Sequence, residues 1–218
     1  SEKEKKNYQK KFDVEEFSGS AKAIFAPDAV DDVISFVNSS KQRLYIAQLY
    51  VHKEWGTKKE PKPNPLLEAA ISRARDDVEV KILLDSSWFN VDEEGKNNED
   101  TINYVNEIAK NENLSMQAKL IDLDMLNLVG LHGKLVIADN AALISSINWG
   151  ENSVMRNREA GIIIEGGAAD YFIQIFLNDW NAMGTAGRAA GTAQLIVFIL
   201  AVAVILVIIS VIHERTRK

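Results

Sequence analysis

The feature that most constrains this chain is a long apolar run near its C-terminus, Leu195 to Ile212, which reads LIVFILAVAVILVIISVI. The run contains one serine and no charged residue. At about 1.5 Å per residue, a helix of this length measures roughly 27 Å, close to the hydrocarbon thickness of a bilayer. A buried helix of a globular domain is the alternative, but such helices are seldom apolar on every face. The run therefore predicts one C-terminal transmembrane helix.

The charges around this run predict its orientation. Arg215, Arg217 and Lys218 follow it, whereas Arg188 is the basic residue close upstream. By the positive-inside rule, we expect the C-terminal tail in the cytoplasm and the globular part on the extracytoplasmic side. His213 is then an interfacial residue. The predicted localisation is a single-pass membrane protein.

Upstream of the run, apolar segments of strand length alternate with segments of helical periodicity. Such alternation indicates a layered α/β domain. Strands are expected at 21–26, 43–51, 78–84, 115–121, 134–138, 142–146 and 160–165, and helices at 28–37, 66–75, 101–110 and 168–183. The predicted parts are a charged arm or linker at 1–17, the domain at 18–183, a small-residue linker at 184–194, the transmembrane helix at 195–212 and a basic tail at 213–218.

Composition limits the classes of function. The 218 residues are 46% hydrophobic, which suits one domain with a real core. The net charge of −6 gives no global basic field that would draw the chain to nucleic acid. The absence of cysteine excludes disulfides and thiolate metal sites, but leaves the redox compartment open.

The stretch HGKLVIAD carries the strongest chemical signal. His132 and Lys134 are two apart, so in a strand both side chains would point to the same face. An imidazole can act as a nucleophile or proton carrier near neutral pH, and an ammonium can neutralise a phosphate oxygen. Asp139 is expected to end the strand and anchor its turn. A lone His-x-Lys pair is more often a half-exposed strand edge, so the neighbouring residues have to decide.

Those neighbours complete an ordered pattern of H-x-K-x4-D, then S-x-N, then N-x-E. The seven positions are His132, Lys134, Asp139, Ser146, Asn148, Asn157 and Glu159. From about Ser18 to Trp180 the chain resembles one half of a phospholipase D superfamily enzyme, particularly the membrane-associated prokaryotic and archaeal members. One departure is that Ser145 takes the usual glycine place, one residue early. The resemblance implies a layered fold with a mixed β-sheet flanked by helices.

The resemblance also implies a role for each position. His132 would be the nucleophile that forms a phosphohistidine, or the matching acid that protonates the leaving alcohol. Lys134 and Asn148 would hold non-bridging phosphate oxygens, and Glu159 would orient the His132 ring. Ser146 would add a supporting hydrogen bond.

The resemblance also implies roles for the two remaining positions of the motif. Asn157 belongs to the same supporting set, and Asp139 would be structural or would link two halves. No metal and no cofactor are required.

Such a site needs two motifs, and this sequence shows one. His52 is followed directly by lysine and has no matching aspartate, so we interpret it as a loop residue. A homodimer can supply the second motif across a two-fold axis. Alternatively, an N-terminal half with its own motif is missing, which the lysine-rich start and the absence of an initial methionine favour.

Three functions compete. The first is a membrane-anchored phosphodiesterase or phosphatidyltransferase that acts on phospholipid, and the second is a membrane-tethered endonuclease. The third is a degenerate half that only completes a dimer, which the complete motif argues against. Lysines at 3–11 and in KKEPK at 58–62 favour nucleic acid, whereas the acidic balance favours lipid.

A few further residues have two interpretations each. Asp85 follows a buried strand, where site residues often lie, but a cap for the SSWFN turn is the better prediction. Trp55, Trp88, Phe89 and Trp149 either rim a lipid site or are simply buried.

Overall fold

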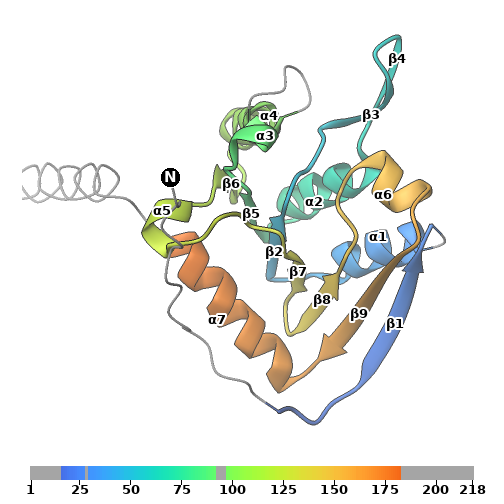
Figure 1. Ribbon diagram of the computed structural model, residues 1–218, viewed down its shortest axis with the longest axis vertical. Coiled ribbons are helices and arrows are strands. Elements are labelled where there is room, and N and C mark those ends of the chain that lie inside the picture. The colour runs from blue at the N-terminus through green and yellow to red at the C-terminus, as the bar shows by residue number, and fades with distance from the viewer. Residues whose placement is uncertain (1–15, 28, 92–96, 183–218) are drawn as a thin grey trace, which may run out of the picture. The chain divides into compact units, whose positions relative to one another are not determined.

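A computed structural model describes residues 16–27, 29–91 and 97–182. All of them belong to the first of two units into which the chain divides, Ser1–Ala182 and Met183–Lys218. One mixed sheet has the strand order β1-β9-β8-β7-β2-β5-β6, and β3 pairs with β4 as a separate hairpin (Figure 1). The strands are β1 (Ala21–Ala26), β2 (Arg43–Gln48), β3 (Glu54–Thr57), β4 (Glu60–Pro63), β5 (Glu79–Leu84), β6 (Met116–Leu120), β7 (Lys134–Ala138), β8 (Ala141–Ser145) and β9 (Glu159–Glu165).

Helices cover both faces of the seven-stranded sheet. The helices are α1 (Val30–Ser39), α2 (Pro65–Arg75), α3 (Trp88–Val91), α4 (Asn98–Glu112), α5 (Leu123–Leu126), α6 (Glu151–Met155) and α7 (Gly167–Asn181). Buried residues of α1, α2 and α4 pack in one hydrophobic cluster against the sheet, and those of α7 and α5 pack in a second cluster. The predicted mixed sheet flanked by helices is therefore confirmed.

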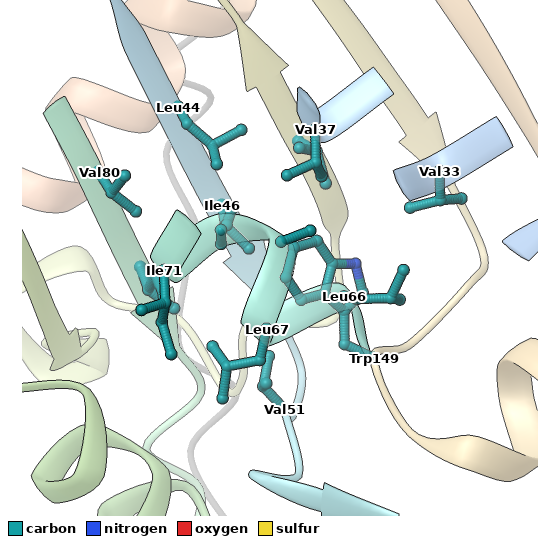
Figure 2. Close-up of a cluster of buried hydrophobic side chains, with 14 of the residues drawn as sticks. Val33, Val37, Leu44, Ile46, Val51, Leu66, Leu67, Ile71, Val80 and Trp149 are labelled. Carbon is teal, nitrogen blue, oxygen red and sulfur yellow. The ribbon is translucent and has the colours of Figure 1, made fainter. Parts of the chain in front are cut away.

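The central strand β2 shows why the sheet is covered twice. Leu44 and Ile46 face the cluster of α1 and α2, while Tyr45 and Ala47 face the cluster of α7. All four are buried, as expected for a strand with helices on both sides. Figure 2 shows Leu44 and Ile46 in the first cluster, which also contains Leu67 and Ile71 of α2.

Two buried asparagines fix the loops that leave the carboxyl end of β2. Asn98, at the start of α4, donates from Nδ2 to Leu49 O at 2.9 Å and to Asp85 O at 2.8 Å. Its Oδ1 accepts from Val51 N at 3.3 Å. The ends of β2 and β5 are thereby held together by a side chain that is itself fully buried.

Asn64 does the same on the other side of this loop. Its Nδ2 donates to His52 O at 2.7 Å and to Trp149 O at 2.9 Å, and its Oδ1 caps α2 through Leu66 N at 3.0 Å. An asparagine is well suited to a helix N-cap because its side-chain oxygen satisfies the free N–H groups of the first turn. The loop after β8 is therefore tied to the loop after β2.

The predicted fold class needs one correction, which concerns the transmembrane helix. Within residues 16–27, 29–91 and 97–182, no helix is long and apolar enough to cross a membrane. The longest described helices, α4 and α7, have 15 residues each, which is about 22 Å against a hydrocarbon core of about 30 Å. The run at 195–212 lies outside the described residues, as do the predicted linker at 184–194 and tail at 213–218. The supported fold class is the mixed α/β domain alone.

Candidate active site

The H-x-K pair lies at one end of β7, and its two side chains meet. Lys134 is the first residue of the strand and only 5% exposed, whereas His132 is exposed in the segment before it. The Lys134 ammonium donates to His132 O at 2.5 Å and lies 3.2 Å from His132 Nδ1. β7 begins at Lys134, as expected, so the two residues do not lie in one strand. They come together because the lysine side chain reaches back to the histidine.

Two carboxylates from other parts of the sheet affect the charge of Lys134. Burial lowers the pKa of Lys134, and the negative charges of Glu159 and Asp85 partly oppose this shift. Glu159 begins β9 and Asp85 follows β5. The two carboxylates favour the charged form of Lys134, and an ammonium can hold a non-bridging oxygen of a phosphodiester.

Glu159 is the centre of a hydrogen-bonded network. Its Oε2 accepts from Ser146 Oγ at 2.5 Å, and its Oε1 accepts from Ser153 Oγ at 3.0 Å and from Asn157 Nδ2 at 3.1 Å. Burial by itself raises the pKa of Glu159, but these hydrogen bonds and the charge of Lys134 outweigh it and hold the pKa below its ordinary value. The carboxylate is therefore kept ionised beside the lysine.

Ser153 is a member of this network that the sequence pattern did not indicate. Besides donating to Glu159, its Oγ accepts from Asn148 N at 2.9 Å. The side-chain Oδ1 of Asn148 is buried and has no hydrogen-bond partner. Ser153 lies in the short helix α6, between the S-x-N and N-x-E positions, and no spacing in the sequence distinguishes it from an ordinary loop serine.

Asp85 caps its turn, as predicted, and also holds the loop that carries His132. Its Oδ2 accepts from Ser87 N and from Asn90 Nδ2, both at 2.9 Å. Its Oδ1 accepts from Leu131 N at 2.5 Å, one residue before His132. The carboxylate is fully buried, so these contacts fix the approach to β7.

Asp139 lies at the opposite end of β7 and takes no part in this cluster. It adopts a left-handed conformation with φ 51° in the turn between β7 and β8. Three backbone N–H groups at the start of β2 donate to its carboxylate: Lys41 at 2.7 Å, Gln42 at 2.8 Å and Arg43 at 3.0 Å. Burial raises the pKa of Asp139, but these hydrogen bonds outweigh it, so the pKa is lowered. Its bonds within one chain favour the structural role over a link between halves.

Tyr50 and His52 border the other side of the site. Their rings stack at 4.8 Å, and the backbone N of His52 donates to Trp149 O at 3.4 Å. Burial raises the pKa of Tyr50, and the charge of Glu159 raises it further. His52, which the sequence predicts to lie in a loop, therefore lies beside the loop of the S-x-N motif.

The predicted site residues therefore fall into two places. The sheet registers place Lys134, Ser146 and Glu159 at the same end of strands β7, β8 and β9. Asn148 and Asn157 lie in the adjoining loops. Asp139 lies at the opposite end of β7. Glu159 makes its hydrogen bonds to Ser146, Ser153 and Asn157, and its orienting role toward His132 stays a prediction. In the described ranges, no three His, Asp or Glu side chains are arranged to hold a metal ion.

Comparison with known proteins agrees with this geometry. The family model described as cardiolipin synthase, PLD-like domain, matches residues 33–180, which is more than half of the chain. The chain therefore belongs to the phospholipase D-like family. No curated protein sequence matches it significantly.

Two solved structures are similar in fold. Nuc from Salmonella typhimurium, a phospholipase D family member, has a TM-score of 0.59 and 19% identity over 76% of this chain and 96% of its own. NucT from Helicobacter pylori has a TM-score of 0.55 and 19% identity over 74% of this chain and 98% of its own. At this identity the likeness shows the fold alone.

Proposed function

We propose that this chain cleaves the phosphodiester bond of phospholipid headgroups through a phosphohistidine at His132. The observation that carries the proposal is the contact of an exposed histidine with a buried lysine beside the Glu159 network. A nucleophile, a cation for phosphate oxygens and an ionised carboxylate are the groups that such a displacement needs. Membership of the phospholipase D-like family supports the same chemistry.

The proposed reaction has two displacements. The unprotonated ring nitrogen of His132 attacks phosphorus, and the bond from phosphorus to the alcohol oxygen breaks. A second histidine gives its proton to that oxygen and then takes a proton from water. The resulting hydroxide attacks phosphorus and releases His132, while Lys134 balances the charge on the non-bridging oxygens. An alcohol in place of water would give transfer instead of hydrolysis.

We infer that the second histidine comes from a second copy of this chain. One H-x-K-x4-D motif is present, and a two-fold axis would bring two identical sites together. The match to nearly the whole length of Nuc supports a chain that contributes one such domain. A separate N-terminal half with its own motif remains the alternative source.

An exposed apolar rim beside His132 supports a lipid substrate. We define this rim as Trp88, Phe89 and Val129, which are 73%, 54% and 87% exposed. Helix α3, which carries the two aromatic residues, begins next to the Val129 segment, because Ser87 Oγ donates to Val129 O at 3.5 Å. Aromatic side chains in this setting are typical of contact with the interface of a bilayer.

One observation favours nucleic acid as a second candidate substrate. The β3–β4 hairpin exposes Lys58, Lys59 and Lys62. It also lines a cavity of about 320 Å³ together with Tyr50 and Arg156, next to the S-x-N loop. A basic arm near the site is suited to a phosphate backbone.

The test compares three substrates for the full chain: mixed phosphatidylcholine and phosphatidylglycerol vesicles, bis(p-nitrophenyl) phosphate, and single-stranded DNA. We expect turnover of vesicles and of the soluble ester, both abolished in His132→Ala, with a dimer mass by light scattering. Cleavage of DNA but not of lipid would favour the second candidate. Equal activity of wild type and His132→Ala would reject the proposal.

The role of the rim is tested with a matched pair of variants. We expect Trp88→Ala/Phe89→Ala to lower vesicle turnover about 10-fold, since each aromatic buries a large area at an interface, and to leave bis(p-nitrophenyl) phosphate turnover unchanged. Phe25 has the same 54% exposure as Phe89 but lies on the edge strand β1. Phe25→Ala should therefore leave both activities at the wild-type level.

A further inference from the structure

Gln48 is a buried polar residue that nothing in the described structure satisfies. It is the last residue of β2 and is 1% exposed. Neither its Nε2 nor its Oε1 has a hydrogen-bond partner. A buried amide without partners destabilises a fold, and such groups are therefore rare away from functional sites. Its place at the end of the central strand β2 calls for a partner outside the described residues.

The sheet register places Gln48 beside Lys134. The antiparallel pairing of β2 with β7 runs to Ala47 opposite Leu135, so the next step sets Gln48 opposite Lys134. Directly opposed residues of neighbouring strands project from the same face. Lys134 is in turn opposite Ser145 of β8. The side chains of Gln48 and Lys134 thus project from the same face of the sheet, at the strand ends where the site lies.

The surroundings fix Gln48 in this place. The loop that follows it is held by Asn98 through Leu49 and Val51. Gln48 is also in register with Leu84 of β5, which precedes Asp85. The backbone of Gln48 is therefore held between the neighbouring strands β5 and β7.

We propose that Gln48 is a substrate-binding residue of this site. Its Nε2 donates to a non-bridging oxygen of the phosphodiester that Lys134 holds, and its Oε1 accepts from a hydroxyl group, of the alcohol or of water. An amide supplies both a donor and an acceptor, so it satisfies both needs at once. The inference rests on the proposed phosphodiester chemistry, and deepens it by adding a neutral group to the phosphate contacts of the family motif.

The experiment replaces the amide by an apolar side chain of similar length. Gln48→Met and Gln48→Leu are measured in the full chain for Tm, for turnover of bis(p-nitrophenyl) phosphate, and for Kd of inorganic phosphate by calorimetry. We expect Tm equal to or above wild type, because an unsatisfied buried amide is removed. Turnover should fall at least about 10-fold, and the phosphate Kd should rise about 10-fold.

The control is Gln117→Met on β6, where the glutamine is exposed. It should change neither turnover nor phosphate binding. The inference is overturned if both Gln48 variants lose Tm by several degrees, since the amide would then have a partner within the fold. Wild-type turnover and phosphate Kd in a folded Gln48 variant would overturn it as well.

Failure of the proposed function gives a different result. A wild-type chain that turns over none of the three substrates, yet binds phosphate in a manner that depends on Gln48, would reject the phosphodiesterase and retain the phosphate contact. Turnover that depends on His132 but not on Gln48 would support the phosphodiesterase and reject the Gln48 contact.

Discussion

The two ends of strand β7 differ in how well their polar groups are satisfied. At one end, Asp139 receives three backbone hydrogen bonds from the start of β2. At the other end, Lys134 is buried with a lowered pKa, and the amide of Gln48, at the end of the neighbouring strand β2, has no hydrogen-bond partner among the described residues. The H-x-K-x4-D motif thus places a buried lysine at one end of β7 and a hydrogen-bonded aspartate at the other end.

The difference indicates separate roles within one motif: one end of β7 stabilises the fold, and the other end is available to a substrate. Groups that are fully paired stabilise the fold and have nothing left to offer a substrate. Groups that are buried and incompletely paired weaken the fold, and are retained where a ligand completes them. We therefore expect changes at the two ends of β7 to have opposite effects on stability and activity.

The largest expected effect is at Lys134. Lys134→Met should lower turnover of bis(p-nitrophenyl) phosphate about 1000-fold, because the cation for the non-bridging oxygens is lost. Its Tm should not fall, since the ammonium is buried and burial lowers its pKa. Burial also lowers the pKa of Lys119, which packs against Trp180 away from the site. Lys119→Met is the matched control, and a loss of turnover there would undo the comparison.

The second effect is at Asp139 and should have the opposite character. Asp139→Ala should lower the free energy of unfolding by about 2–3 kcal/mol, because three donors lose their charged acceptor. The kcat of the remaining folded protein should stay within about threefold of wild type. Denaturant unfolding and active-site titration measure the two quantities. A kcat loss as large as that of Lys134→Met would show that both ends serve the chemistry.

The pH dependence of the Asp139 effect follows from its pKa. The pKa of Asp139 is lowered in the folded chain. Its ionised form therefore stabilises the fold above the unfolded value of about 4, and this contribution is lost as pH falls through the folded value. The stability difference between wild type and Asp139→Ala should be constant near pH 7 and should shrink below about pH 4. A difference that grows in acid would contradict this assignment.

A third effect concerns Asp85, whose charge helps to keep Lys134 protonated. Asp85→Asn should lower turnover about 10-fold. It should also move the alkaline limb of the pH–rate profile to lower pH, because removal of the carboxylate lowers the pKa of Lys134 further. Asp122→Asn, a change at the cap of α5, is the control with the same chemistry. If the alkaline limb stays in place, Asp85 acts only by holding Leu131.

The smallest effect is expected at Ser153. Ser153→Ala removes one hydrogen bond from Glu159 and leaves those of Ser146 and Asn157. Turnover should fall only about threefold. The acidic limb of the profile should move to higher pH, since the hydrogen bonds lower the pKa of Glu159. A shift in the other direction would mean that the Glu159 carboxylate is not the group that titrates there.

Much of the sheet could be predicted from sequence, because its strands are short apolar runs with clear ends. The expected strands at 21–26 and 134–138 coincide with β1 and β7. No strand is expected from sequence at the β3–β4 hairpin, because EWGT and EPKP lack apolar alternation. Within β3, Gly56 has φ 84°, and an added Cβ would lie 2.5 Å from Glu60 O. Backbone conformation of this kind has no signature in a polar, proline-rich segment.

The site was predictable in its residue types but not in its partners. The ordered motif comprises seven positions. Six of them lie around the strand ends where β7 begins, whereas Asp139 lies at the opposite end of β7. Ser153 and the bond from Leu131 to Asp85 depend on which loops pack together, and spacing alone carries no information on that. Gln48 was hidden for another reason, because it directly follows the apolar run at 44–47 of its strand.

The pairing of β1 with β9 has a consequence for how the domain is assembled in time. Ala21 is in register with Ile164, so this edge of the sheet joins segments from the two ends of the described domain. Closing so long a loop is entropically slow, and contacts of this separation tend to form late. During synthesis, β1 leaves the ribosome before the other described strands and yet has no partner until β9 follows. Among the described strands, the first to be made is therefore the last one able to pair.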